Sequence, residues 1–122
     1  MKNLFFLLII LGALLTSCED PIEVTLIEVE PLLVVDAWLN NIDDTQIIKL
    51  TNSQAYFDST PATGITNAEV TVTRDDGEVF EFSHTSDGTY THTLGSNASL
   101  GDIGDSFTLS INVDAQEYAA TT

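Results

Sequence analysis

Apolar and polar side chains alternate with a period of two along much of this chain. The alternation is strict in residues 68–73 and appears again in residues 106–113. Because successive side chains of a β-strand point to opposite faces, each segment predicts a strand with one buried face. After residue 17 no segment shows a helical period of useful length. The chain is therefore predicted to fold as an all-β protein.

Turn sequences divide the rest of the chain into seven or eight short strands. Residues 75–77 (Asp-Asp-Gly) and 87–88 (Asp-Gly) each end in a glycine that can adopt positive φ. Residues 32–39 are apolar almost without interruption, which predicts a central strand covered on both faces. Residues 53–66 lack a period and are expected to form a loop that crosses between sheets or covers an edge. For residues 31–122 this spacing predicts an antiparallel β-sandwich of Ig-like or prealbumin-like type.

The first 17 residues have the composition of an export signal. Lys2 gives a positive start, and residues 4–15 are apolar. As a helix this run would span roughly 18 Å, too short for a hydrocarbon core of ~30 Å, so we expect a signal peptide rather than a permanent span. The sequence Leu-Thr-Ser-Cys at residues 15–18 resembles the bacterial lipobox. That resemblance implies cleavage before Cys18 and attachment of a lipid to its thiol.

A plain secretory signal and a short membrane anchor are the alternatives to lipid attachment. The small residues before Cys18 and the absence of any other cysteine favour the lipid anchor. With its only cysteine used in this way, the chain can form no internal disulfide. Residues 18–30 then form an acidic tether. Glu19 and Asp20 resemble a signal for the outer face of the outer membrane, and a solvated linker explains them equally well.

The charge balance restricts the partners of the chain. Nineteen acidic residues stand against three basic ones, for a net charge of −16. Nucleic acid is excluded as a partner, because no basic stripe exists to replace the counterions of a polyanion. Anionic lipid headgroups are repelled as well. We therefore expect the lipid on Cys18, and not the protein surface, to make the membrane contact.

Five segments of the chain are distinctive in combination. They are the lipobox, residues 18–21 (Cys-Glu-Asp-Pro), residues 30–39, residues 55–58 (Ala-Tyr-Phe-Asp) and residues 68–72. Together they resemble a Bacteroidota lipoprotein family of unknown function, whose members are often encoded beside TonB-dependent outer-membrane receptors. The resemblance covers essentially the whole chain. It implies an outer-membrane lipoprotein with an N-terminal β-sandwich, and a TonB-dependent receptor as its partner.

Members of that family are longer, with a second region after this domain. The final strand stops at Thr122 without a polar tail. We therefore expect the chain to be an N-terminal fragment. Because the family has no agreed active site, the resemblance implies no functional residue.

His84 and His92 are the sharpest candidates for a metal site. In a hairpin around residues 87–88 they would lie opposite or diagonal across the ladder, within reach of one ion. The sequence offers no third ligand, and both fit equally well as ordinary strand residues, so we expect no metal and no cofactor. Acidic clusters at residues 75–78 and 102–105 lack EF-hand spacing, and we expect their carboxylates to form hydrogen bonds with the backbone of turns. The alternative is a weak Ca²⁺ site between two loops.

No motif in the sequence supports catalysis, so we expect a protein that is not an enzyme. Tyr56 and Phe57, in the loop without a period, are the candidates for contact with a ligand or partner. Trp38 shares a strand face with Leu32 and Val34 and is expected in the core. A lipid-anchored accessory or interaction module at the outer membrane or cell surface, assisting a TonB-dependent receptor in ligand uptake, is the function we expect. The alternative is a surface-exposed structural or adhesive Ig-like domain without a transport role.

Overall fold

The structure, a computed structural model, describes residues 30–42, 44–96 and 98–122. The expected signal peptide, Cys18 and almost all of the tether lie outside these ranges. Within the described ranges, no helix is long and apolar enough to pass through a bilayer.

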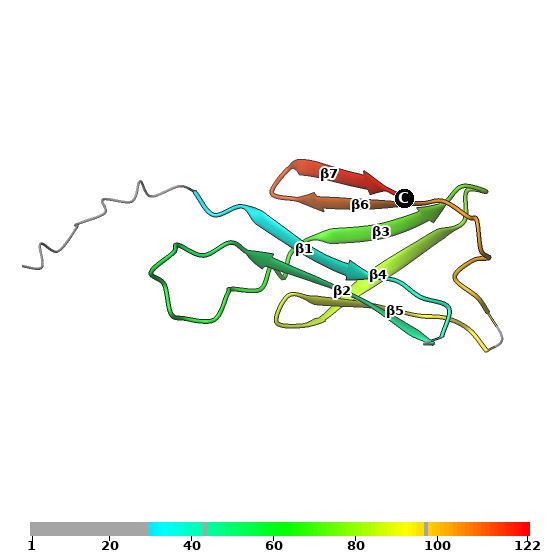
Figure 1. The fold of residues 1–122 in the computed structure, drawn as a ribbon, viewed down its shortest axis with the longest axis horizontal. Coiled ribbons are helices and arrows are strands. Elements are labelled where there is room, and N and C mark those ends of the chain that lie inside the picture. The colour runs from blue at the N-terminus through cyan, green and yellow to red at the C-terminus, as the bar shows by residue number, and fades with distance from the viewer. Residues whose placement is uncertain (1–29, 43, 97) are drawn as a thin grey trace, which may run out of the picture.

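Seven β-strands make up the domain (Figure 1). They are β1 (Leu33–Trp38), β2 (Thr45–Asn52), β3 (Glu69–Arg74), β4 (Val79–Ser86), β5 (Thr89–Thr93), β6 (Phe107–Val113) and β7 (Gln116–Thr121). All neighbouring strands are antiparallel, in the order β1-β2-β5-β4-β3-β6-β7. The prediction of an all-β antiparallel fold is confirmed.

Strand β4 joins the two halves of the curled sheet. Residues 79–82 pair with β3, whereas residues 83–86 pair with β5. A register shift between His84 and Ser86 interrupts the second of these ladders. Such irregularities bend a strand and increase its twist. The result is a curled arrangement consistent with a sandwich-like fold, with β1 at one edge and β7 at the other.

The core is formed by the inward faces that the alternation predicted. Val70 and Val72 of β3 lie opposite Phe82 and Phe80 of β4, and all four side chains are buried. The buried apolar side chains are Ile48, Leu50, Val70, Val72, Phe80, Phe82, Tyr90, Leu100, Ile111 and Val113. Phe107 and Leu109, which were expected on the same inward face as Ile111, are only half-buried.

The prediction that residues 32–39 form a central strand is wrong. β1 is an edge strand that pairs with β2 alone, and the Trp38 side chain is 81% exposed rather than in the core. Because Ala37 lies opposite the buried Ile48 and Trp38 opposite the half-exposed Ile47, the two residues occupy opposite faces of the sheet. In this chain the strand that is apolar on both faces is therefore an edge strand, and other strands do not cover its apolar side chains.

Two glycines hold the loop of residues 53–66 against the domain. Gly64 forms a bridge with Thr51 of β2 and packs directly on the turn that contains Gly88. A Cβ on either glycine would collide with backbone atoms of the other segment or of Leu50, and Gly88 has a φ of 74°. The end of the loop is therefore fixed by backbone contacts that only glycine permits.

Tyr90 fastens the same region from inside the core. Its side chain is fully buried, and its hydroxyl donates to the Ile65 carbonyl oxygen (3.0 Å) and accepts from the Ala68 N–H (2.9 Å). One side chain of β5 thereby ties the end of the loop to the start of β3.

We predict that Tyr90→Phe lowers the free energy of unfolding by about 1–3 kcal/mol, because it leaves the Ile65 carbonyl and the Ala68 N–H without their partner. Urea unfolding measures this. The control is Tyr118→Phe, which removes only an exposed hydrogen bond to Gln116 and should change the midpoint little. Equal midpoints for the two variants would contradict the role of Tyr90.

Candidate functional site

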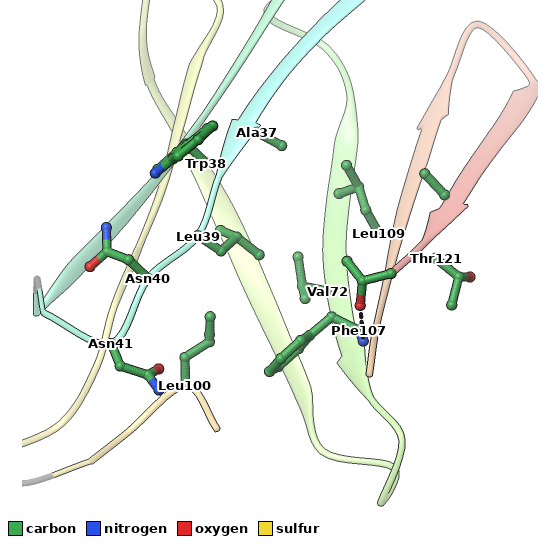
Figure 2. A pocket seen from close by; sticks show the side chains of 12 residues that line it. Ala37, Trp38, Leu39, Asn40, Asn41, Val72, Leu100, Phe107, Leu109 and Thr121 are labelled. Atoms are coloured by element: carbon green, nitrogen blue, oxygen red, sulfur yellow. Dashed lines mark hydrogen bonds between the residues drawn. The ribbon is translucent and has the colours of Figure 1, made fainter. Parts of the chain in front are cut away.

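A cleft of about 520 Å³ opens between the C-terminal end of β1 and the strands β6 and β7 (Figure 2). Its lining residues come from segments that are far apart in the sequence. They are Ala37, Trp38, Leu39, Asn40, Asn41, Val72, Leu100, Phe107, Leu109, Ala120, Thr121 and Thr122. This volume falls within the ~300–1,000 Å³ range of ordinary ligand pockets.

The two walls of the cleft come from opposite ends of the strand order. Figure 2 shows Leu39 directed toward Val72 and Phe107, while the Trp38 ring points away from them. On the other wall, Leu109 of β6 pairs with Ala120 of β7. The curl of the sheet brings these walls together and leaves the side between β1 and β7 open.

The lining of the cleft is neutral. None of its residues carries a charged side chain, although the whole chain has a net charge of −16. Polar atoms at the rim are already engaged: the Asn41 side-chain amide donates to the Gly101 carbonyl oxygen (2.6 Å), and the Phe107 N–H donates to the Thr122 hydroxyl (3.1 Å). The cleft therefore suits uncharged, apolar groups better than ions.

Strands β1 and β7, which lie on either side of the cleft, each have one edge that no other described strand covers. The Leu32 carbonyl accepts from the Ser53 N–H, on the β2 side. Because antiparallel strands alternate the direction of their backbone groups, those of Leu33, Val35 and Ala37 point away from β2. Uncovered edges with apolar side chains are the surfaces to which an additional strand can bind.

Tyr56 and Phe57 lie where the sequence predicted, on the surface of the loop. They are 85% and 74% exposed, and their rings meet edge to face with centroids 5.0 Å apart. Beside them, Asp58 accepts hydrogen bonds from the Thr60 N–H and hydroxyl, which lower the pKa of its carboxyl. The aromatic pair belongs to the opposite end of the domain from residues 39–41, so it forms no common site with the cleft.

The two histidines share a face of the sheet but have different neighbours. His84 pairs with Tyr90 across the ladder, and their rings lie 5.3 Å apart. His92 contacts Phe80 and Phe82, at 5.5 and 5.6 Å between ring centroids, and its Nδ1–H donates to the Glu81 carbonyl oxygen (2.8 Å). Within the described ranges, no three side chains of His, Cys, Asp or Glu gather as metal ligands.

The acidic cluster of residues 75–78 surrounds Arg74. The guanidinium donates to Asp76 and Glu78 at 2.6 Å each, and it also reaches the carbonyl of Leu100 (3.1 Å), which lines the cleft. The hydrogen bond from Arg74 lowers the pKa of Asp76, and a backbone hydrogen bond from Glu78 adds to the effect. Arg74 therefore connects the β3–β4 turn to one wall of the cleft.

The seven-stranded antiparallel order, the curled sheet and the neutral cleft define a small all-β domain with two uncovered edges. The chain belongs to the family described as Domain of unknown function (DUF4249), whose profile matches residues 19–122. Neither the curated proteins nor the solved structures contain a match to the chain. The match covers every described residue, so the cleft lies within the family domain.

Sequence reasoning missed the cleft. Its walls are made of residues that alternation places correctly on inward faces, such as Leu109, but alternation does not say which inward faces stay uncovered. The signal for the cleft in the sequence is the apolar run through Ala37 and Leu39. The sequence alone predicts that this run belongs to a central strand.

We predict that Asp76→Asn destabilises the domain at pH 7 and that the difference from the wild type disappears in acid. The pKa of Asp76 is depressed in the folded state, so its contribution is present above its unfolded pKa and is lost as pH falls through the folded pKa. Melting temperatures from pH 7 down to below the ordinary aspartate pKa measure this. The neighbouring Asp75→Asn variant removes the same charge without removing a bond to Arg74. Identical pH profiles for the two variants would refute the assignment.

Proposed function

We propose that the protein is a lipid-anchored interaction module of a bacterial outer membrane or cell surface. In this proposal an extended segment of a partner protein docks in the cleft between β1 and β7, and the partner is a TonB-dependent receptor that the module assists in ligand uptake. The observation that carries the proposal is a neutral, apolar cleft bordered by two uncovered strand edges.

Strand addition is the mode of recognition that this geometry favours. Backbone groups of an uncovered edge supply affinity, and alternate side chains of the added strand supply specificity by entering pockets. Val35 and Ala37 belong to the inward face of β1 and are nevertheless exposed, so side chains of an added strand can pack on them. The lining residues are apolar or carry neutral polar groups, which suits the side chains of an added strand.

The membrane attachment is supported by the N-terminal sequence. A short apolar run followed by Leu-Thr-Ser-Cys at residues 15–18 matches the pattern of lipid-attachment signals. Two or three acyl chains, at about 0.8 kcal/mol per buried CH₂, hold a protein on a bilayer almost permanently. A net charge of −16 would prevent retention by anionic headgroups alone.

We predict that the mature protein begins at an acylated Cys18. Intact-mass measurement on membranes of expressing cells should show the added lipid, and the Cys18→Ala variant should lack it and leave the membrane fraction. Protease added outside the cells then distinguishes an outer-face from a periplasmic location. A mature chain that starts elsewhere without lipid would refute the anchor.

We predict that Val35→Lys and Ala37→Lys reduce co-purification with a β-barrel receptor at least about tenfold, the equivalent of 1.4 kcal/mol. Each variant places a charge on the inward face of β1 beside the apolar cleft. The matched control is Val34→Lys on the outward face of the same strand, where its neighbour Thr51 is half-exposed, and it should retain the partner. Equal recovery with all three variants would contradict the cleft as the docking site. Recovery of host glycans or matrix alone would favour the adhesive alternative.

A further inference from the structure

The exposed aromatic pair lies at the end of the domain where the N-terminal chain arrives. Leu32, just before β1, donates its N–H to the Ser53 hydroxyl (2.9 Å) and accepts from the Ser53 N–H (2.8 Å), so it touches the first residue of the loop. Tyr56 and Phe57 follow within four residues. Figure 1 shows that this loop projects beyond the β4–β5 and β6–β7 turns at the same end. Among the described residues, this loop is the part of that end that extends furthest from the domain (Figure 1).

Large apolar side chains are exposed at this projecting end. Leu32 is 67% exposed, and Tyr56 and Phe57 are the most exposed aromatic side chains apart from Trp38 in the described ranges. The T-shaped contact between the two rings makes them one apolar unit. Tyrosine is enriched at the interface between lipid and water, and phenylalanine and leucine occur on apolar faces that bury at the same boundary.

We propose that the tip of this loop, Tyr56 and Phe57 with Leu32 behind it, rests in the headgroup region of the bilayer that carries the lipid anchor. This inference relies on the proposed anchor at Cys18, and it adds to the lipid contact a contact by the protein surface that the net charge alone does not predict. Twelve peptide units separate Cys18 from Glu30, so even at full extension the tether reaches about 40 Å. The lipid thus keeps the domain close to the bilayer and attaches it through the end at which Tyr56 and Phe57 lie (Figure 1).

The charge of the loop selects the lipid. Asp58 stands next to Phe57, and the hydrogen bonds from the Thr60 N–H and hydroxyl lower the pKa of its carboxyl. Glu30 adds a second carboxylate at the same end. Anionic headgroups are repelled by both, whereas zwitterionic headgroups carry a cation that a carboxylate and a tyrosine ring attract. The preferred surface is therefore a zwitterionic phospholipid.

The test couples the Cys18 thiol of the mature chain, which keeps every described residue, to a maleimide lipid in phosphatidylcholine vesicles. Trp38→Phe removes the native tryptophan, and Phe57→Trp then places a fluorophore at the loop tip. We expect its emission to shift to the blue and to be quenched by phosphatidylcholine with brominated acyl chains. Because the coupling is chemical, this result does not depend on whether cells acylate Cys18 or on any receptor.

The control is Ile103→Trp in the same Trp38→Phe background. Ile103 is fully exposed in the loop of residues 95–106, at the opposite end of the domain, and should show no quenching. Equal quenching at the two positions, or none at Phe57→Trp, would overturn the proposal. Replacing half of the lipid by phosphatidylglycerol should weaken the quenching at Phe57→Trp, and stronger quenching would overturn the zwitterionic preference. Circular dichroism of each variant verifies that it has folded.

Discussion

The division of β4 between two neighbours is the constraint on which the rest of the domain depends. Its first half belongs to the ladder with β3, and its second half belongs to the ladder with β5. Phe80 and Phe82 of this strand are buried, so the strand that joins the two halves of the sheet also fills the space between them. A strand shared in this way forces the sheet to curl, and the curl determines that β1 and β7 face each other across an open side.

The charged side chains and the apolar cleft occupy different parts of this strongly acidic domain. Carboxylates are placed in turns such as residues 75–78, where Arg74 and backbone N–H groups bind them. The cleft is lined without any of them. A high net charge opposes self-association, and the neutral cleft is the surface where this repulsion has no local source. This division explains how one small domain can be highly charged and still present an apolar surface.

The sequence predicted those features that depend on near neighbours along the chain. Alternation placed Val70 and Val72 in the core, and the lack of a period placed Tyr56 and Phe57 on a loop surface. The sequence wrongly predicts β1 as a central strand of the sheet. A strand covered on both faces and an edge strand beside a cleft have the same apolar pattern, so the sequence does not distinguish them. The cleft itself was not predictable, since it arises where the curl brings two distant edges together and nothing in a local pattern encodes that approach.

The loop of residues 53–66 is largely ordered by its own hydrogen bonds. The Asp58 N–H donates to the Ala55 carbonyl, the Gln54 side chain donates to the Thr60 carbonyl, and the bridge between Thr51 and Gly64 closes the base. Fixing a residue of flexible backbone costs about 1–2 kcal/mol of conformational entropy. Because much of that ordering is already present in the folded domain, a contact made by this loop would cost little further conformational entropy.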